Sequence, residues 1–105
     1  MDLAQFRATV AGGAPPEGMS LALQTLWWDA KGDWNRAHQC AQQDEGKTGS
    51  IVHAYLHRKE GDLPNAQYWY RQAERAVGYG DLQREWETIV AELLRSGRCS
   101  VLVTA

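Results

Sequence analysis

The chain has 105 residues, of which 44% are apolar and 23% are charged, and its formal net charge is −2 at pH 7. That length suits one domain with a buried core, and the composition is typical of a globular rather than a disordered chain. Binding to phosphate backbones needs a basic face, so the slightly acidic charge balance argues against a nucleic-acid partner.

The start of the chain, its hydropathy and its cysteines all bear on the compartment. Residues 1–7 lack the basic and apolar regions of a signal peptide. No apolar run approaches the roughly 20 residues that cross a bilayer. Cys40 and Cys99 have no CxxC partner and are most simply reduced thiols. We therefore expect a cytoplasmic protein that has no membrane partner.

Apolar residues recur at helical spacing along most of the chain, which predicts an all-α fold of about six helices in one domain. Leu3, Phe6 and Val10 mark the first helix, and a linker rich in glycine and proline follows it. The predicted divisions are an N-terminal helix within residues 1–12, two helical hairpins within 17–77, a C-terminal helix over 81–97 and an extended tail over 98–105. The first hairpin helix is expected to start near residues 17–20 and to end at Gly32, and the second to follow Asp33 and run out by Gly46, with a loop over residues 44–50. The third and fourth hairpin helices are expected to span about 50–60 and 63–77.

A glycine followed directly by an aspartate occurs three times between predicted helices: Gly32-Asp33, Gly61-Asp62 and Gly80-Asp81. Glycine readily adopts the left-handed conformation that closes one helix, and the aspartate side chain accepts hydrogen bonds from the first amides of the next helix. Each pair therefore predicts a tight turn that makes consecutive helices antiparallel.

The residues around these turns repeat. The second hairpin carries Ala54, Gly61, Asp62, Leu63, Ala66, Tyr70 and Ala73, and the first carries Thr25, Gly32, Asp33, Trp34, Ala37 and Ala41. This pattern resembles the tetratricopeptide repeat, a pair of helices about 34 residues long. The resemblance covers roughly residues 20 to 77 and implies a compact bundle that binds a protein or peptide. It also implies that the first helix of each pair lines the groove, with Asp29, Tyr55 and Arg58 as candidate binding residues.

Two segments, residues 27–38 and residues 53–73, also look like a group of small bacterial proteins. That likeness implies a bacterial cytoplasmic protein. It implies no particular chemistry.

His53 and His57 stand four residues apart, so on a helix both rings project from the same face. Such a pair can take part in binding zinc or nickel, with Glu60 or His38 needed to complete a site. The interpretation that we favour from the sequence is that both histidines pack between helices. A ligand-binding surface and a metal site are the alternatives, and no metal or other cofactor is assigned.

Consecutive aromatic residues, at Trp27-Trp28 and Tyr68-Trp69-Tyr70, cannot all face the core of a helix bundle. Trp28 and Tyr68 are therefore candidate contact residues for a partner. Coverage by other helices is the alternative.

No catalytic motif is recognisable, because the chain lacks a nucleophile elbow and a glycine-rich phosphate loop. We assign no catalytic residue and expect no enzyme. The first hypothesis is a helical module that binds a protein or peptide. The alternatives are a metal- or ligand-binding protein or enzyme that uses His53 and His57, and a structural homo-oligomer such as a homodimer.

Overall fold

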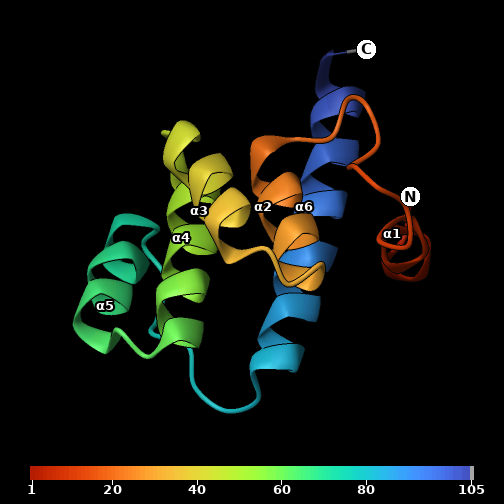
Figure 1. Cartoon of the computed structure of the whole chain (residues 1–105). Coiled ribbons are helices and arrows are strands. Elements are labelled where there is room, and N and C mark those ends of the chain that lie inside the picture. Colours follow the sequence, from red (N-terminus) through yellow and green to blue (C-terminus); the bar gives the residue numbers. More distant parts are fainter. Residues whose placement is uncertain (105) are drawn as a thin grey trace.

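The computed structural model describes the backbone of residues 1–104 and the side chains of residues 1–95. Six helices account for most of this part of the chain, and it contains no strand, which confirms the all-α prediction (Figure 1). The helices are α1 (Leu3–Thr9), α2 (Leu21–Ala30), α3 (Trp34–Gln43), α4 (Lys47–Glu60), α5 (Leu63–Gln72) and α6 (Leu82–Thr104). None of these described helices combines the length and apolar character needed to cross a membrane.

The predicted Gly-Asp turns join α2 to α3 and α4 to α5. Gly32 and Gly61 have φ angles of 85° and 93°, in the left-handed region that favours glycine. The Asp33 carboxylate accepts a hydrogen bond from the Arg36 amide, and the Asp62 carboxylate accepts one from the Asn65 amide. Both turns therefore close one helix and cap the next, as the sequence predicts.

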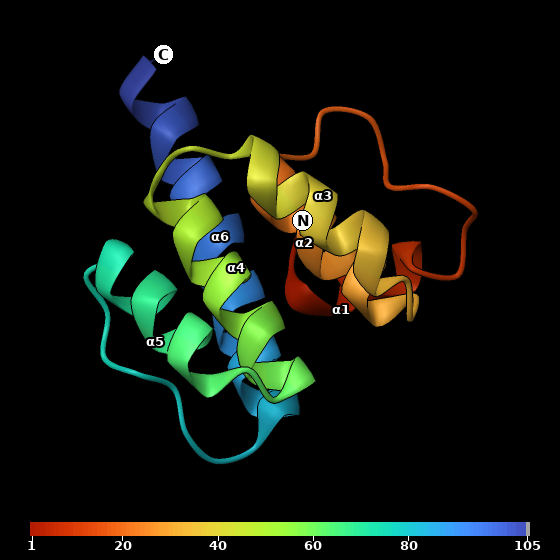
Figure 2. The same cartoon turned by 60° about the vertical axis from the view of Figure 1, so that its left-hand side comes forward.

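Helix α4 lies at the centre of the arrangement. Helices α3 and α5 pack on it from two sides, and no Cα pair of α3 and α5 comes within 8 Å (Figures 1 and 2). Helix α6 packs against α2 and α4, and α1 packs against α6. The Trp86 indole of α6 donates a hydrogen bond to the Leu26 carbonyl oxygen at 3.1 Å, and its ring packs on Phe6. Helix α6 therefore covers the face of α2 and α4 that the tetratricopeptide resemblance leaves open as a groove.

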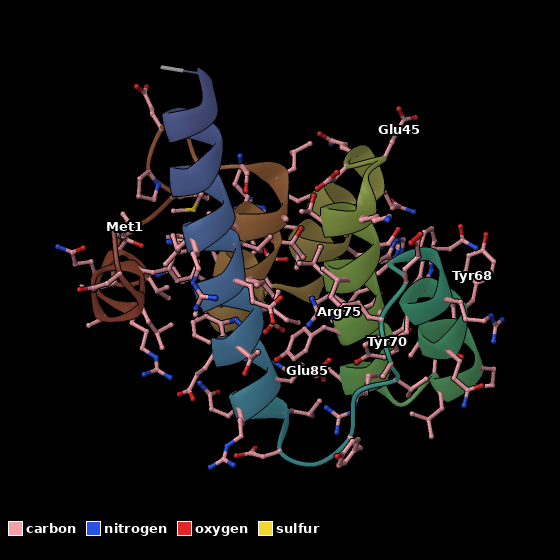
Figure 3. All side chains as sticks on the ribbon, turned by 180° about the vertical axis from the view of Figure 1, so that it is seen from behind. Met1, Glu45, Tyr68, Tyr70, Arg75 and Glu85 are labelled. Atoms are coloured by element: carbon pink, nitrogen blue, oxygen red, sulfur yellow. The ribbon has the colours of Figure 1, made fainter. Side chains whose placement is uncertain are left out.

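Glu85 of α6 ties three helices together. Its carboxylate accepts a hydrogen bond from the Tyr70 hydroxyl of α5 (Figure 3). The same carboxylate pairs with the Arg58 guanidinium of α4 at 2.6 Å. Gly78 passes close by, and a side chain there would come within 2.5 Å of Tyr70 Oη. The segment between α5 and α6 is held against this network.

Three predicted helix boundaries are wrong. Helix α4 begins at Lys47 rather than at Ser50, because the Asp44 carboxylate accepts hydrogen bonds from the Gly46 amide and the Thr48 hydroxyl and so holds an extra first turn. Helix α5 ends at Gln72 rather than at Val77, since Glu74 takes a left-handed φ of 58°. The third Gly-Asp pair therefore starts a helix but does not join two helices directly.

The last of these boundaries concerns the end of the chain. The sequence predicts that the final helix ends at Gly97 and that residues 98–105 form an extended tail. Helix α6 instead continues to Thr104, and residue 105 lies outside the described residues. One glycine inside a helix costs only about 1 kcal/mol relative to alanine, so it does not by itself end a helix.

Candidate functional site

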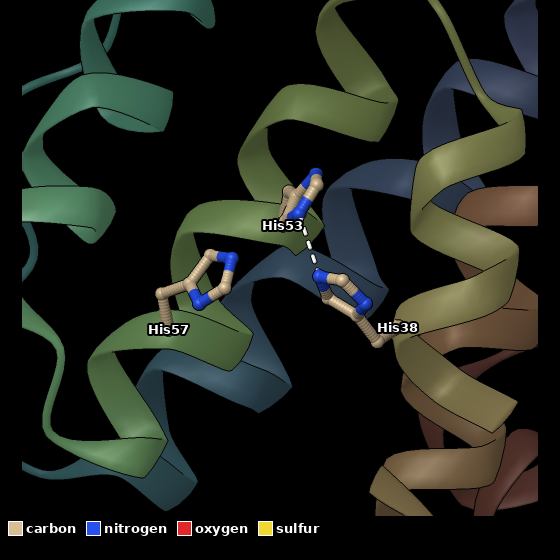
Figure 4. Close-up of side chains that lie close together, drawn as sticks. All are labelled: His38, His53 and His57. Atoms are coloured by element: carbon tan, nitrogen blue, oxygen red, sulfur yellow. Dashed lines mark hydrogen bonds between the residues drawn. The ribbon is translucent and has the colours of Figure 1, made fainter. Parts of the chain in front are cut away.

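All three histidines of the chain lie in one cluster. His53 and His57 project from the same face of α4, and His38 reaches them from α3 (Figure 4). The Nε2 atoms of His38 and His53 are 3.0 Å apart. The ring centroids of His53 and His57 are 4.9 Å apart, and those of His38 and His57 are 5.3 Å apart. The sequence predicted that His53 and His57 lie together. The structure adds a third histidine, His38, from the neighbouring helix α3.

Small residues at the interface allow this approach. Ala37 and Ala41 of α3 and Ala54 of α4 are fully or almost fully buried. Side chains this short let the two helices pack closely, so the imidazole of His38, next to Ala37, reaches the face of α4. His53 and His57 are only 5% and 6% exposed, which confirms the prediction that they pack between helices.

Two indole rings flank the cluster. Trp34 of α3 stacks on His38 with the ring centroids 4.7 Å apart, and Trp69 of α5 stacks on His53 at 4.0 Å. The Trp34 indole also donates a long hydrogen bond of 3.4 Å to the Leu56 carbonyl oxygen. These contacts restrict rotation of two of the three imidazoles and so preorganise the cluster.

His57 is oriented by polar partners at both ring nitrogens. Its Nδ1 atom lies 2.6 Å from a carboxylate oxygen of Glu60, and its Nε2 atom lies 3.3 Å from the side-chain amide nitrogen of Asn65. A carboxylate accepts and an amide nitrogen donates, so the proton of a neutral His57 belongs on Nδ1. The Nε2 lone pair then accepts the hydrogen of the Asn65 amide, a contact that a metal ion bound at Nε2 would replace.

Burial controls the protonation of the other two histidines. It lowers the pKa of His53 to about 4, and the nearby His38 and His57 act in the same direction. Burial also lowers the pKa of His38, an effect that His57 reinforces and Glu60 opposes. Both rings are therefore neutral near pH 7, which is the form that binds metal ions.

The distances within the cluster are compatible with a shared metal ion. One nitrogen from each histidine lies within 4.8 Å of the others. Zn–N bonds of 2.0–2.1 Å in a tetrahedral site place two ligand nitrogens about 3.3 Å apart. Small ring movements would bring the three nitrogens to that spacing. His57, Glu60 and Asp62 form a second group within the same limit, but both of its carboxylates are exposed.

The residues predicted to line a groove gather elsewhere. Asp29 is buried and accepts hydrogen bonds from the Tyr55 hydroxyl at 3.2 Å and the Lys59 ammonium at 2.8 Å. Arg58 pairs with Glu85, as described above. All these partners belong to the chain itself.

The two candidate aromatic contacts lie apart from the histidines. Trp28 is half-buried, packs edge-on against Trp27 and carries the Arg36 guanidinium over its ring. Tyr68 is 46% exposed on the outer side of α5 (Figure 3). Cys40 is half-buried, and burial raises the pKa of its thiol, which makes it a poor nucleophile.

Sequence reasoning named His38 and Glu60 only as residues that could complete a site, and it assigned no role there to Trp34 or Asn65. Asn65 reaches His57 across the Gly61-Asp62 turn, a contact for which the sequence offers no signal beyond the turn itself. Fold and cluster together define an all-α protein with a three-histidine cluster between two helical hairpins. Comparison with protein families, with curated proteins and with solved structures found no match to this chain.

Proposed function

We propose that this protein binds one divalent transition-metal ion, with Zn²⁺ as the first candidate, through His38, His53 and His57. The observation that carries the proposal is the convergence of every histidine in the chain, with one nitrogen of each ring within 4.8 Å of the others. Imidazole nitrogens are good ligands for transition-metal ions, and three of them at this spacing could be shared by one cation.

The donor set selects the class of metal. Imidazole nitrogen suits zinc, copper, nickel and iron, whereas magnesium and calcium prefer oxygen ligands. Zinc has no geometric preference from its d electrons and accepts three histidines readily. Among the described side chains, no thiol or carboxylate joins the three histidines within 4.8 Å.

The surroundings of the cluster support the same proposal. Histidine ligands usually donate their second ring N–H to a carboxylate or carbonyl, which orients the ring and makes it a better ligand. Glu60 stands in that position at Nδ1 of His57. Trp34 and Trp69 hold the other two rings by stacking.

Peptide binding through the first helix of each hairpin has less support. Tyr55 is 2% exposed and Asp29 is 5% exposed, and α6 lies against the helices that carry them. Helix α6 leaves beside Asp29 and Tyr55 a cavity of about 330 Å³, which is too small for a folded partner.

The test is a metal titration of protein purified without a histidine tag. Zn²⁺ competed against a chromophoric chelator should bind at one equivalent per chain. His38→Ala should weaken binding by at least tenfold, because His38 is the most exposed of the three histidines and its loss removes one ligand with least damage to the core. Cys40→Ser is the matched control on the same helix and should bind as wild type does.

Circular dichroism and thermal melting of each variant would show whether the helices remain. Wild-type protein that takes up no stoichiometric metal would overturn the proposal. So would a folded His38→Ala variant with wild-type affinity.

A further inference from the structure

A cavity of about 370 Å³ opens next to the histidine cluster. It lies where α3 and α5 diverge over the N-terminal half of α4. Its lining residues are Ala41, Gln42, Asp44, Glu45, Ser50, His53 and Trp69. His53 belongs to both the cavity wall and the cluster, so the cavity reaches one of the three proposed metal ligands.

Only three ligands are available to the metal from the described side chains. The fourth position of a tetrahedral ion must therefore be filled from outside this set. Glu60 is not counted as the fourth ligand, because its carboxylate pairs with Nδ1 of His57 at 2.6 Å and does not lie within 4.8 Å of the ligand atoms of all three histidines. Three protein ligands with one open position is the arrangement of catalytic zinc, whereas structural zinc sites are closed by four protein ligands.

We propose that the bound metal keeps an exchangeable coordination position that opens into this cavity and accepts water or a small anion. The inference rests on the proposed metal-binding function. Three neutral imidazoles leave the full charge of the ion unbalanced, so an anionic oxygen or nitrogen donor is favoured at the fourth position. The cavity is large enough for a small ligand and too small for a folded partner.

The cavity also carries two carboxylates, from Asp44 and Glu45. The Asp44 carboxylate is engaged by the Gly46 amide and the Thr48 hydroxyl, whereas Glu45 is exposed. Negative charge here raises the local concentration of an entering cation and opposes an entering anion. The same negative charge favours the approach of a metal ion through this cavity.

The test uses Co²⁺, whose visible absorption reports coordination number and ligand exchange. Protein without a histidine tag is loaded with one equivalent of Co²⁺ and titrated with azide at low ionic strength. We expect a saturable change in the visible spectrum as azide replaces water. An unchanged spectrum in protein that holds Co²⁺ would overturn the open position and leave metal binding intact. Failure to bind Co²⁺ or Zn²⁺ at all would overturn both proposals.

A charge variant tests the direction in which the position opens. Glu45→Gln removes one negative charge from the cavity and should tighten azide binding by about twofold at low salt. The same variant should slow association of Co²⁺ in stopped-flow measurements. Glu17→Gln makes the same charge change at an exposed residue that does not line the cavity, and it should behave as wild type. Equal azide affinities in the two variants would show that the position opens elsewhere.

Discussion

The Nε2 atoms of His38 and His53 lie 3.0 Å apart, although the two residues belong to different helices and are 15 positions apart in the sequence. At that separation one nitrogen must donate a hydrogen and the other must accept it, because two lone pairs would repel each other. A metal ion between the two rings would replace this hydrogen and widen the pair to about 3.3 Å. Metal binding should therefore change the separation of these two nitrogen atoms.

Metal removal should lower the stability of the protein. A ligand that binds only the folded state stabilises it, by about 2.7 kcal/mol when its free concentration is 100 times Kd. We expect Zn²⁺ to raise the Tm of the wild type and an excess of chelator to reverse the increase. His38→Ala should show a much smaller zinc-dependent increase in Tm than the wild type does. Equal zinc-dependent shifts in both proteins would place the metal somewhere other than the cluster.

Glu60→Gln should weaken zinc binding while leaving all three ligands in place. Loss of a carboxylate that orients a ligating histidine typically reduces metal affinity about 10- to 100-fold. Competition with a chromophoric chelator measures the change. Glu92→Gln, which breaks the exposed ion pair with Arg75, is the matched control and should leave the affinity unaltered.

The metal-free protein should lose stability as the pH falls below about 6.5. Burial lowers the pKa of folded His53 to about 4, so between these values the unfolded chain binds a proton that the folded chain does not. The free energy of unfolding therefore rises with pH across this window and falls on acidification. His38 and His57 face His53 and also lower its pKa. Asp44, Glu45 and Glu60 are the nearby acidic residues.

Urea unfolding in chelator at pH 7.0, 6.0 and 5.5 measures this dependence. His53→Gln removes the titrating group and should give a flatter pH profile than the wild type. A profile with the same slope in both proteins would contradict the assignment to His53.

The turn between α4 and α5 should be sensitive to both of its residues. Gly61 has a φ of 93°, and no atom lies within 4 Å of a Cβ placed there, so Gly61→Val should destabilise through backbone strain alone, by about 1 kcal/mol or more. Asp62→Ala should cost roughly 0.5–2 kcal/mol, because it removes the hydrogen bond that caps α5. Gly13→Ala, at an open position without positive φ, should melt as wild type does.

Trp86→Ala should be strongly destabilising, by about 3–5 kcal/mol, because Trp86 is 4% exposed and anchors α6 against α2. Chemical unfolding measures the loss. Tyr79→Ala removes a comparably large ring that is 91% exposed and should change stability by less than about 0.5 kcal/mol. Similar losses in the two variants would mean that α6 does not cover the groove face in solution.

The helices and the two hairpin turns could be predicted from the sequence because their signals are local. Asp33 and Asp62 cap amides three residues away, and the glycines before them need only a particular φ angle. The helix boundaries that were predicted wrongly depend on contacts between residues that are distant in the sequence, or on weak local signals. Val77 fits the helical stripe of α5, but the chain turns at Glu74 and passes beside Tyr70 and Glu85, which come from different helices.

The sequence by itself determined that His53 and His57 share a face, since a spacing of four residues nearly completes one helical turn. Only the tertiary structure decided what that face meets. His38 contacts this face because buried alanines let α3 approach α4 closely. Trp69 and Asn65 contact it because the Gly61-Asp62 turn brings α5 back against α4. The placement of α6 over α2 and α4 likewise depends on the packing of Trp86, a contact between residues 60 positions apart. Periodicity specifies which side of a helix is apolar, whereas the choice of partner depends on side-chain volumes and shapes that meet only in the folded chain.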